Sequence, residues 1–524
     1  MTKKEGKMKR AICFSLGFVF FMLAAESALA TVKLFDEKLT LNGYVKEVAF
    51  YRTSMQDMEA KYHDTNFDFL KTSAGIEALY SIKESQDLTI RFFTGLKWWY
   101  EAAPRIDDQY GRSMDHRFKK DYVTPRDFDE DVLNEAYFDF ISGPFQVRIG
   151  KQIVVWGNLD VDRAADVVNP VDLRHAMFGV DKWEEFKRGI FMIRMFYQTQ
   201  LPGNLRMEAI FNPGDFKQDL LPLDGGGHYG TPLHLNNPFD SDPSFMHWQF
   251  EKSRRDAPGW STNNYEFGFK LSGYTWDIDW SLIYYNSING APIIDPKAVG
   301  PFMEQYIFGN ILPWQEVGDW PGYRVFKYKR NQIVGGTFEK CMTSGGLLRG
   351  STLTVEWYYD IHSPFNLGTN GDASATYGMI RKNILGGAVK FYQKYNIPGF
   401  TQSRICTGKQ FEMTITYYFE KIFKDEYDLI QNTRYHRRGD SVADSISVFC
   451  MQPMFNYVWT FVFNSYYKPR IGKWFVMPAV RYNFPGKHWS FETGLCLYGG
   501  AKNDYTHSVY EHKDSVILKL TYEW

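Results

Sequence analysis

The sequence predicts an all-β fold: a closed antiparallel transmembrane β-barrel of about 16 strands, within a range of about 14–18. Three observations lead to this fold class. Polar and apolar residues alternate with a period of two along much of the chain, aromatic residues make up 18% of its 524 residues, and short and long connections alternate between these segments. In such barrels, one face of each strand meets lipid, short turns join strands at the periplasmic end, and long loops lie outside the cell.

The first 30 residues have the features of a secretory signal peptide. A basic start, "MTKKEGKMKR", precedes the apolar run "AICFSLGFVFFMLAA", and "SALA" ends it with small residues. This order is typical of a cleaved leader, and the run is short for a membrane anchor. We therefore expect cleavage after Ala30 and a barrel formed by residues 31–524. No second apolar run long enough for a transmembrane helix follows.

Composition excludes several function classes. The net charge of −1 disfavours a nucleic-acid partner. Four cysteines follow the leader, and their wide spacing does not fit a zinc site, although the sequence leaves open whether any of them form disulfides. These are Cys341, Cys406, Cys450 and Cys496. The histidines are mostly isolated in expected loops, with no nucleophile pattern beside them, so we expect neither an enzyme nor a bound cofactor.

The alternating segments also predict which residues face the lumen. Segments 264–273, 277–285, 351–361, 409–420 and 489–499 each place apolar residues on one face and polar residues on the other. The residues that we expect on the lumen face are Arg91, Lys97, Trp99, Glu135, Asp139, Arg148, Gln152, Arg194, Glu266, Lys270, Glu356, Glu412, Tyr418 and Tyr498. Charges of both signs favour a neutral or amphipathic solute over charge selection, and salt bridges between strands explain the mixture equally well.

Connections of two lengths separate the segments. Short connections occur at 142–144, at 201–204 and near residues 273 and 485, whereas long ones cover 102–131, 157–187, 214–262 and 287–325. Region 421–470 is ambiguous, because it fits either one strand or a hairpin that turns at Gln452 and Pro453.

The final segment, "SVILKLTYEW", predicts the strand that closes the barrel. We expect its apolar positions Val516, Leu518, Leu520 and Tyr522 on the lipid face, and Trp524 at the end of the strand at the periplasmic interface. A terminal aromatic residue on such a strand resembles the insertion signal that the outer-membrane assembly machinery recognises.

The long connection after residue 152 departs from the repeating pattern. It contains Asp160, Asp162 and Asp166, whose spacing does not match a calcium-binding loop, so we expect no metal. "NPVDLRHAMF" then predicts a short helix. Asn169 stands at the N-cap, Pro170 at the first helical position, and Asp172 where a carboxylate meets free amide groups. We expect residues 157–180 to fold into the barrel mouth and narrow it.

These same residues carry a resemblance to a known family. "RIGKQ", "WG" and "NPVD" resemble the Gram-negative outer-membrane proteins catalogued as domain of unknown function 1302. The matching positions are Arg148, Gly150, Lys151, Gln152, Trp156, Gly157, Asn169, Pro170 and Asp172, whereas Asn158 replaces the family's usual acidic residue. The resemblance implies an outer membrane with lipid and lipopolysaccharide around the barrel. It also implies export or trafficking of hydrophobic compounds, with a periplasmic carrier and an inner-membrane pump as partners.

Three function classes remain open from the sequence. The first is a passive channel for an organic or lipid-like solute, in which Arg148, Gln152, Trp156, Gly157 and the segment from Asp160 to Asp172 form the constriction. The second is a general or ion-selective porin. The third is a structural barrel that encloses a partner complex.

Overall fold

A computed structural model shows the fold of the chain. The residues that it describes are 32–53, 67–103, 123–125, 127–159, 163–172, 183–219, 259–290, 293–294, 326–343, 346–369, 372–407, 409–423, 429–430, 442–470, 472–500 and 514–524. The predicted signal peptide lies outside these residues, as do Asp160 and Asp162.

Long antiparallel strands make up most of the described chain. The first half of the wall contains β2 (Leu39–Arg52), β3 (Phe67–Glu84), β4 (Thr89–Glu101), β5 (Leu133–Ser142), β6 (Phe145–Gln152), β7 (Ile190–Gln198), β8 (Arg206–Asn212), β9 (Glu266–Thr275) and β10 (Ile278–Ile288). The second half contains β13 (Arg330–Cys341), β14 (Thr352–Thr369), β15 (Asp372–Tyr395), β16 (Phe411–Ile422), β18 (Val442–Met454), β19 (Trp459–Lys468), β20 (Lys473–Asn483), β21 (Trp489–Gly499) and β22 (Ser515–Glu523).

Shorter elements lie at the margins of the wall. Strands β1 (Val32–Leu34) and β17 (Leu429–Ile430) pair with β2 and β14, and β11 (Ile293–Ile294) pairs with β12 (Phe326–Lys327) in a separate sheet. The helical turns are η1 (Phe128–Val132), η2 (Trp183–Phe186), η3 (Thr262–Asn264) and η5 (Gly346–Leu348). No helix in the described part of the chain is long and apolar enough to cross a membrane.

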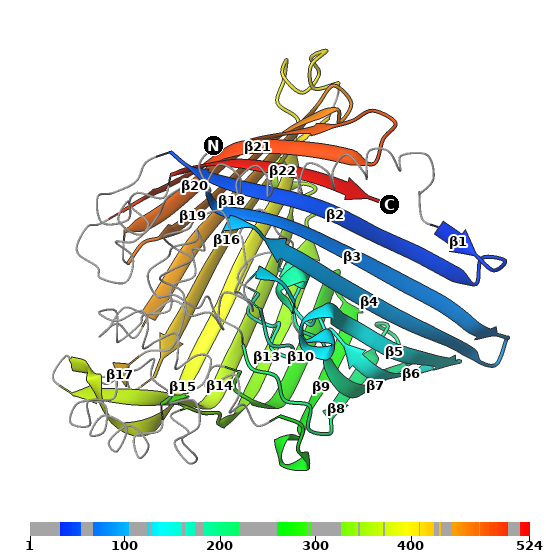
Figure 1. Ribbon diagram of the computed structural model, residues 1–524, viewed down its shortest axis with the longest axis vertical. Helices are drawn as coiled ribbons and strands as arrows, with labels where there is room; N and C mark the ends of the chain where they lie inside the picture. The colour runs from blue at the N-terminus through cyan, green and yellow to red at the C-terminus, as the bar shows by residue number, and fades with distance from the viewer. Residues whose placement is uncertain are drawn as a thin grey trace, which may run out of the picture.

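The wall closes on itself between its first and last strands. Each wall strand pairs with the next, and β22 pairs with β2 from Tyr44 opposite Glu523 to Arg52 opposite Ser515. Two of the 20 strands in this sheet, β1 and β17, lie outside the ring, so the described barrel has eighteen strands (Figure 1). The predicted closed antiparallel barrel and the closing role of the last segment are confirmed. The expected number of about 16 was too low, and eighteen is the upper end of the expected range.

The connections follow the predicted alternation of length. The long segments 102–131, 157–187, 214–262 and 287–325 each fall between strands that are neighbours in the wall, and a short turn joins most of the pairs between them. Region 421–470 contains the β18–β19 hairpin. Its turn occupies residues 455–458, where three residues adopt positive φ, rather than Gln452 and Pro453, which lie within β18.

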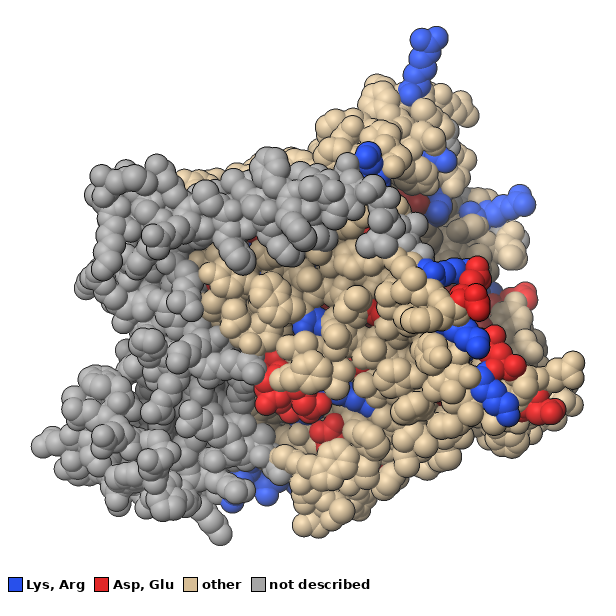
Figure 2. Space-filling model, turned by 45° about the vertical axis from the view of Figure 1, so that its right-hand side comes forward, with Lys and Arg blue, Asp and Glu red and all other residues tan. Residues whose placement is uncertain are grey.

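The register defines an inner and an outer face of the wall. Glu356 on β14 lies opposite Thr337 on β13 and Ala388 on β15, and all three belong to the inner face. Large apolar side chains are exposed on the outer face, among them Phe269, Leu282 and Leu518. Figure 2 shows charged side chains mainly along one edge and beside the grey region, with a broad surface between them that carries few charges.

Aromatic packing supports the seam between β22 and β2. The ring of Tyr522 lies 4.8 Å from that of Trp489 and 5.8 Å from that of Trp524, measured between centroids. The backbone of Trp524 exchanges two hydrogen bonds with Gly43 on β2. Leu518 and Leu520 lie on the outer face of the same strand. The hydrogen bonds and ring contacts of the last residues therefore close the wall and leave no free edge at the seam.

Candidate functional site

Residues 153–189 connect β6 to β7 and are here called the inner loop. Its described residues, 153–159, 163–172 and 183–189, lie in the interior of the barrel (Figure 1). Glu185 of the inner loop accepts a hydrogen bond from Lys46 on β2, at 2.6 Å between Nζ and Oε2. Leu159 of the same loop donates its N–H to Glu356 on β14, at 2.9 Å. Strands β2 and β14 lie on nearly opposite sides of the ring, so a loop that contacts both lies in the lumen (Figure 1).

Trp156 anchors the start of the inner loop. Its side chain is completely buried, and its ring meets Tyr285 edge to face with centroids 6.0 Å apart. The indole N–H donates to Glu208 Oε1 at 2.8 Å, and Lys270 Nζ donates to the Trp156 carbonyl at 3.1 Å. Arg194 Nε donates to the same Glu208 oxygen at 2.8 Å. The Trp of the "WG" pair is therefore fixed by both burial and hydrogen bonds.

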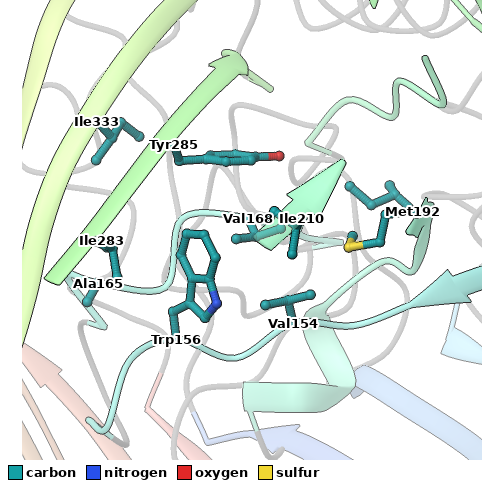
Figure 3. Packing of buried hydrophobic residues seen from close by; sticks show 10 residues of the cluster. Val154, Trp156, Ala165, Val168, Met192, Ile210, Ile283, Tyr285 and Ile333 are labelled. Atoms are coloured by element: carbon teal, nitrogen blue, oxygen red, sulfur yellow. The ribbon is translucent and has the colours of Figure 1, made fainter. Parts of the chain in front are cut away.

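An apolar cluster surrounds this anchor and joins the inner loop to four wall strands, β7, β8, β10 and β13. Figure 3 shows Trp156 pointing from the loop toward Val168 and Tyr285. The buried members of the cluster are Val154, Trp156, Ala165, Val168, Ile190, Met192, Ile210, Ile283, Tyr285 and Ile333. Apolar burial of this kind stabilises the inward position of the loop.

Glu356 on β14 forms the second anchor, close to the first. Its carboxylate accepts the backbone N–H groups of Asn158, Leu159 and Ala165, the last two at 2.9 Å. The glycine of the "WG" pair allows this approach, because a Cβ atom at Gly157 would lie 2.9 Å from Glu356 Oε1. A buried carboxylate thus satisfies backbone donors that cross the lumen without a strand partner.

Asn169 is the third anchor, and its role differs from the predicted helix cap. Its Oδ1 accepts the N–H of Val154 at 2.6 Å, and its Nδ2 donates to the carbonyls of Gln152 and Arg188 at 3.0 and 2.9 Å. The helix start predicted here is wrong, because residues 169–172 form no helical turn and Val171 makes a β-bridge with Lys187.

The physical reason lies in the surroundings of the Asn169 amide. It is buried between two backbone segments, so its donor and its acceptor complete their hydrogen bonds instead of capping a helix. Pro170 and Asp172 continue this extended stretch, and the Asp172 N–H donates to the Phe186 carbonyl. Residues 173–178, the remainder of the predicted helix, lie outside the described residues.

Ion pairs connect the two limbs of the inner loop. Asp166 pairs with Lys187 and with Arg163, and Arg163 also pairs with Glu184 at 2.7 Å. Burial lowers the pKa of Lys187, and the negative charge of Asp166 opposes that shift. Within the described ranges, no group of three or more His, Cys, Asp and Glu side chains is placed to hold a metal ion.

The other predicted lumen residues of β5 and β6 bond to near neighbours. Arg148 pairs with Asp139 at 2.7 Å, and its guanidinium lies 4.0 Å from the centre of the Tyr137 ring. Gln152 donates to the Met192 carbonyl on β7 at 2.9 Å. Among the described residues, the side chains of Arg148 and Gln152 therefore bond along the wall.

Three predicted glutamates have different surroundings. Glu135 accepts the N–H of Ile153 at 2.7 Å, where β6 ends and the inner loop begins. Glu266 accepts hydrogen bonds from Ile288, Asn212 and Tyr285. Glu412 lies apart from the inner loop, where Tyr392 donates to it and Lys394 pairs with it at 3.0 Å.

A cavity of about 320 Å³ lies between the inner loop and the inner face of β9, β10 and β13 to β16. Its lining combines carboxylates, tyrosines and aliphatic side chains, together with the basic side chains of Arg163 and Lys217, which are paired with carboxylates. The carboxylates include Glu266, Asp360 and Glu420. The tyrosines are Tyr285, Tyr358 and Tyr418, and the aliphatic side chains include Ile190, Ile333 and Ile384. A volume of this size, with an apolar lining and a few polar groups, is at the small end of ligand pockets.

Several of these residues did not enter the predicted site. Tyr285, Tyr358 and Asp360 lie on the polar faces of segments 277–285 and 351–361, so alternation placed them in the lumen without marking them as a group. Glu208 was missed, because nothing in its own segment indicates the Trp156 and Arg194 side chains that it binds.

This arrangement defines a class of protein: a closed β-barrel whose lumen is crossed by one of its own long loops. The model of the family described as "Protein of unknown function (DUF1302)" matches residues 12–522. The chain belongs to this family, as the sequence resemblance predicted. No curated protein matches the chain.

Solved structures similar to the chain include barrels from three bacteria. Salmonella typhi OmpF in complex with daunomycin is 11% identical, with 94% of this chain and 100% of that chain covered and a TM-score of 0.39. Acinetobacter baumannii OccAB2 is 8% identical, with 93% and 98% covered and a TM-score of 0.44. Pseudomonas aeruginosa OccK11 is 9% identical, with 95% and 98% covered and a TM-score of 0.41. At these identities and TM-scores, the similarity says nothing about the function of this chain.

Proposed function

We propose that this protein is a passive channel of the Gram-negative outer membrane, which it reaches by means of the predicted signal peptide. The solute is organic or lipid-like and passes along the lumen beside the inner loop. No covalent chemistry takes part, so the protein is not an enzyme. Selection depends on the size of the solute and on its contacts at the narrowest point.

One observation carries the proposal. The inner loop is held against the inner wall on nearly opposite sides of the lumen, by Lys46 of β2 on one side and by Glu356 of β14 on the other, and a cavity remains beside it. A loop with so many buried contacts acts as a fixed constriction. The exposed apolar side chains of the outer face support a location in lipid.

The lining of the cavity favours an organic solute over the alternative of a general porin. Aliphatic and tyrosine side chains lie beside carboxylates there, which suits a molecule that has both a carbon body and a polar group. A structural barrel around a partner complex would need an open lumen, and the inner loop fills part of it. Family resemblance is the support for a periplasmic carrier and an inner-membrane pump as partners.

The test replaces residues 160–178 of the inner loop with a short Gly-Ser linker. This change removes Ala165, Val168 and Asn169 from the lumen, so the single-channel conductance in a planar bilayer should rise severalfold. The matched control inserts the same linker into the β20–β21 turn at residues 484–488, which lies at the end of the wall, and should leave the conductance unchanged. A folded 160–178 variant with the conductance of the wild type would contradict the proposal.

A further inference from the structure

The cavity beside the inner loop contains acidic side chains whose hydrogen-bond partners are neutral. Glu266 accepts from Tyr285 and Asn212, and Asp360 accepts from Asn331 at 3.0 Å. Among the described residues, Glu266 and Asp360 form no ion pair; Arg163 and Lys217, which also line the cavity, pair with other carboxylates, and Arg330 acts on Glu266 only from beyond ion-pair distance. Elsewhere on the inner face, by contrast, Asp139 and Glu208 are each paired with an arginine.

Asp360 supplies a second and independent observation. Its side chain lines the cavity and is only 7% exposed. Its Oδ1 atom is buried and accepts no hydrogen bond of normal geometry within the part of the chain that the structure describes, with the side chain of Ser363 as its nearest hydroxyl neighbour in the cavity lining. An acceptor that is removed from water and left without a donor costs free energy, so its retention beside a cavity indicates a missing N–H or O–H donor.

The remaining lining defines the body of the molecule that would bring this donor. Ile333 and Ile384 offer aliphatic surface, and Tyr358 and Tyr418 contribute rings whose hydroxyl groups donate to Glu420 at 2.7 and 2.9 Å. With these hydroxyl hydrogens already used, the tyrosines offer the solute their rings and lone pairs. Such a site suits a positive group that carries N–H donors on a small apolar body.

We propose that the cavity binds a small organic ammonium ion, a protonated primary or secondary amine with a hydrophobic body. Its N–H groups donate to the unpaired Oδ1 atom of Asp360, which a small side-chain movement brings to the cavity surface, and its charge compensates those of Asp360 and Glu266. This inference rests on the proposed channel function, because it names the class of solute that binds at the constriction during transport. A quaternary ammonium ion fits less well, since it has no N–H to give to Asp360.

Calorimetry on the full mature barrel in an uncharged detergent tests this site with a matched ligand series. The probes are 2-phenylethylammonium, its trimethylated quaternary analogue and the neutral 2-phenylethanol. We expect the primary ammonium to bind with a Kd at least tenfold lower than that of either other probe. Equal Kd values for the ammonium and the alcohol would overturn the proposal, and this comparison needs no variant.

A pair of variants locates the binding. Asp360→Asn keeps the shape of the side chain and removes its charge, so the Kd for 2-phenylethylammonium should rise at least tenfold. Asp279→Asn is the matched control, because Asp279 is an inner-face carboxylate of β10 outside the cavity lining, and it should leave the Kd unchanged. Unaltered binding by a folded Asp360→Asn variant would overturn the proposal.

The same preparations separate the two proposals. A barrel that binds the ammonium ion through Asp360 and conducts no current in a planar bilayer would refute the channel and leave the binding site intact. A barrel that conducts and binds equally well after Asp360→Asn would refute the binding site and leave the channel intact.

Discussion

Two regions of the inner wall use the same strand geometry in opposite ways. Where the inner loop lies against the wall, inner-face positions carry Glu135, Glu208 and Glu356, which bond to the inner loop or to the residue at its start. Around the seam, inner-face positions of β2 and β22 carry Phe50 and Ile517, which pack in an apolar cluster. The remaining buried members of that cluster are Val48, Phe69, Met477 and Cys496.

The difference follows from what each region has to satisfy. A loop brings backbone N–H groups into a space without strand partners, so carboxylates are needed there. The seam brings together two complete strands whose backbone groups already pair, so apolar side chains suffice. A polar inner face therefore marks the part of the wall that holds the inner loop, whereas the apolar part stabilises closure. Changes in the two regions should therefore have different consequences.

The largest effect is expected at the seam. Phe50→Ala removes a buried ring that meets Phe69 edge to face, with centroids 6.2 Å apart. The free energy of unfolding should fall by about 3–5 kcal/mol, measured by urea titration in lipid vesicles, with no change in conductance. Phe128→Ala, at a ring that is 62% exposed, is the control and should cost less than about 0.5 kcal/mol. Equal costs would show that the apolar cluster does not stabilise closure.

A somewhat smaller effect is expected on the outer side of the same seam. Leu518 is 42% exposed on the outer face of β22, so Leu518→Arg should destabilise the barrel by about 2–4 kcal/mol if the residue lies near the middle of the bilayer. Lys519→Arg, one residue along and on the inner face, should change the stability by no more than about 0.5 kcal/mol. If neither change lowers the free energy of unfolding in the same urea titration, the outer face does not lie in lipid.

The smallest effect on the barrel as a whole is expected at the inner loop. Glu356→Gln keeps one carbonyl oxygen but turns an NH₂ group toward backbone donors, which should loosen residues 158–165 by about 1–3 kcal/mol. Hydrogen exchange should quicken in that segment while the unfolding free energy of the wall stays the same. The control is Glu412→Gln, away from the inner loop, where exchange in residues 158–165 should not change. If Glu356→Gln also lowered the free energy of unfolding of the barrel, the inner loop and the seam would not make separate contributions to its stability.

The sequence predicted much of the wall because strand geometry is local. A period of two assigns every residue of a strand to one face, so the inner-face residues of segments 277–285 and 351–361 were available from the pattern alone. The number of strands was harder to predict. In region 421–470, the hairpin turns at residues whose left-handed backbone the sequence did not indicate.

Local rules failed where the partner of a residue is distant in sequence. Asn169 followed by Pro170 matches a helix start, yet the side chain bonds to Gln152, Val154 and Arg188, which surround it only after the inner loop has entered the barrel. A cap forms with the next turn of its own chain, whereas these bonds require burial between two other segments.

The class of fold, the closing strand and the inner or outer side of residues in the clearly alternating segments followed from the sequence alone, because each of these depends on spacing along one strand. Which inner-face residues contact one another depends on the tertiary structure. Glu208 meets Trp156, Glu356 meets Leu159, and Asp360 lines a cavity opposite the inner loop, because closure of the ring brings strands from distant parts of the chain around one lumen. Contacts across the lumen depend on its width and on the residues that fill it, and the alternation of residues along a single strand predicts neither.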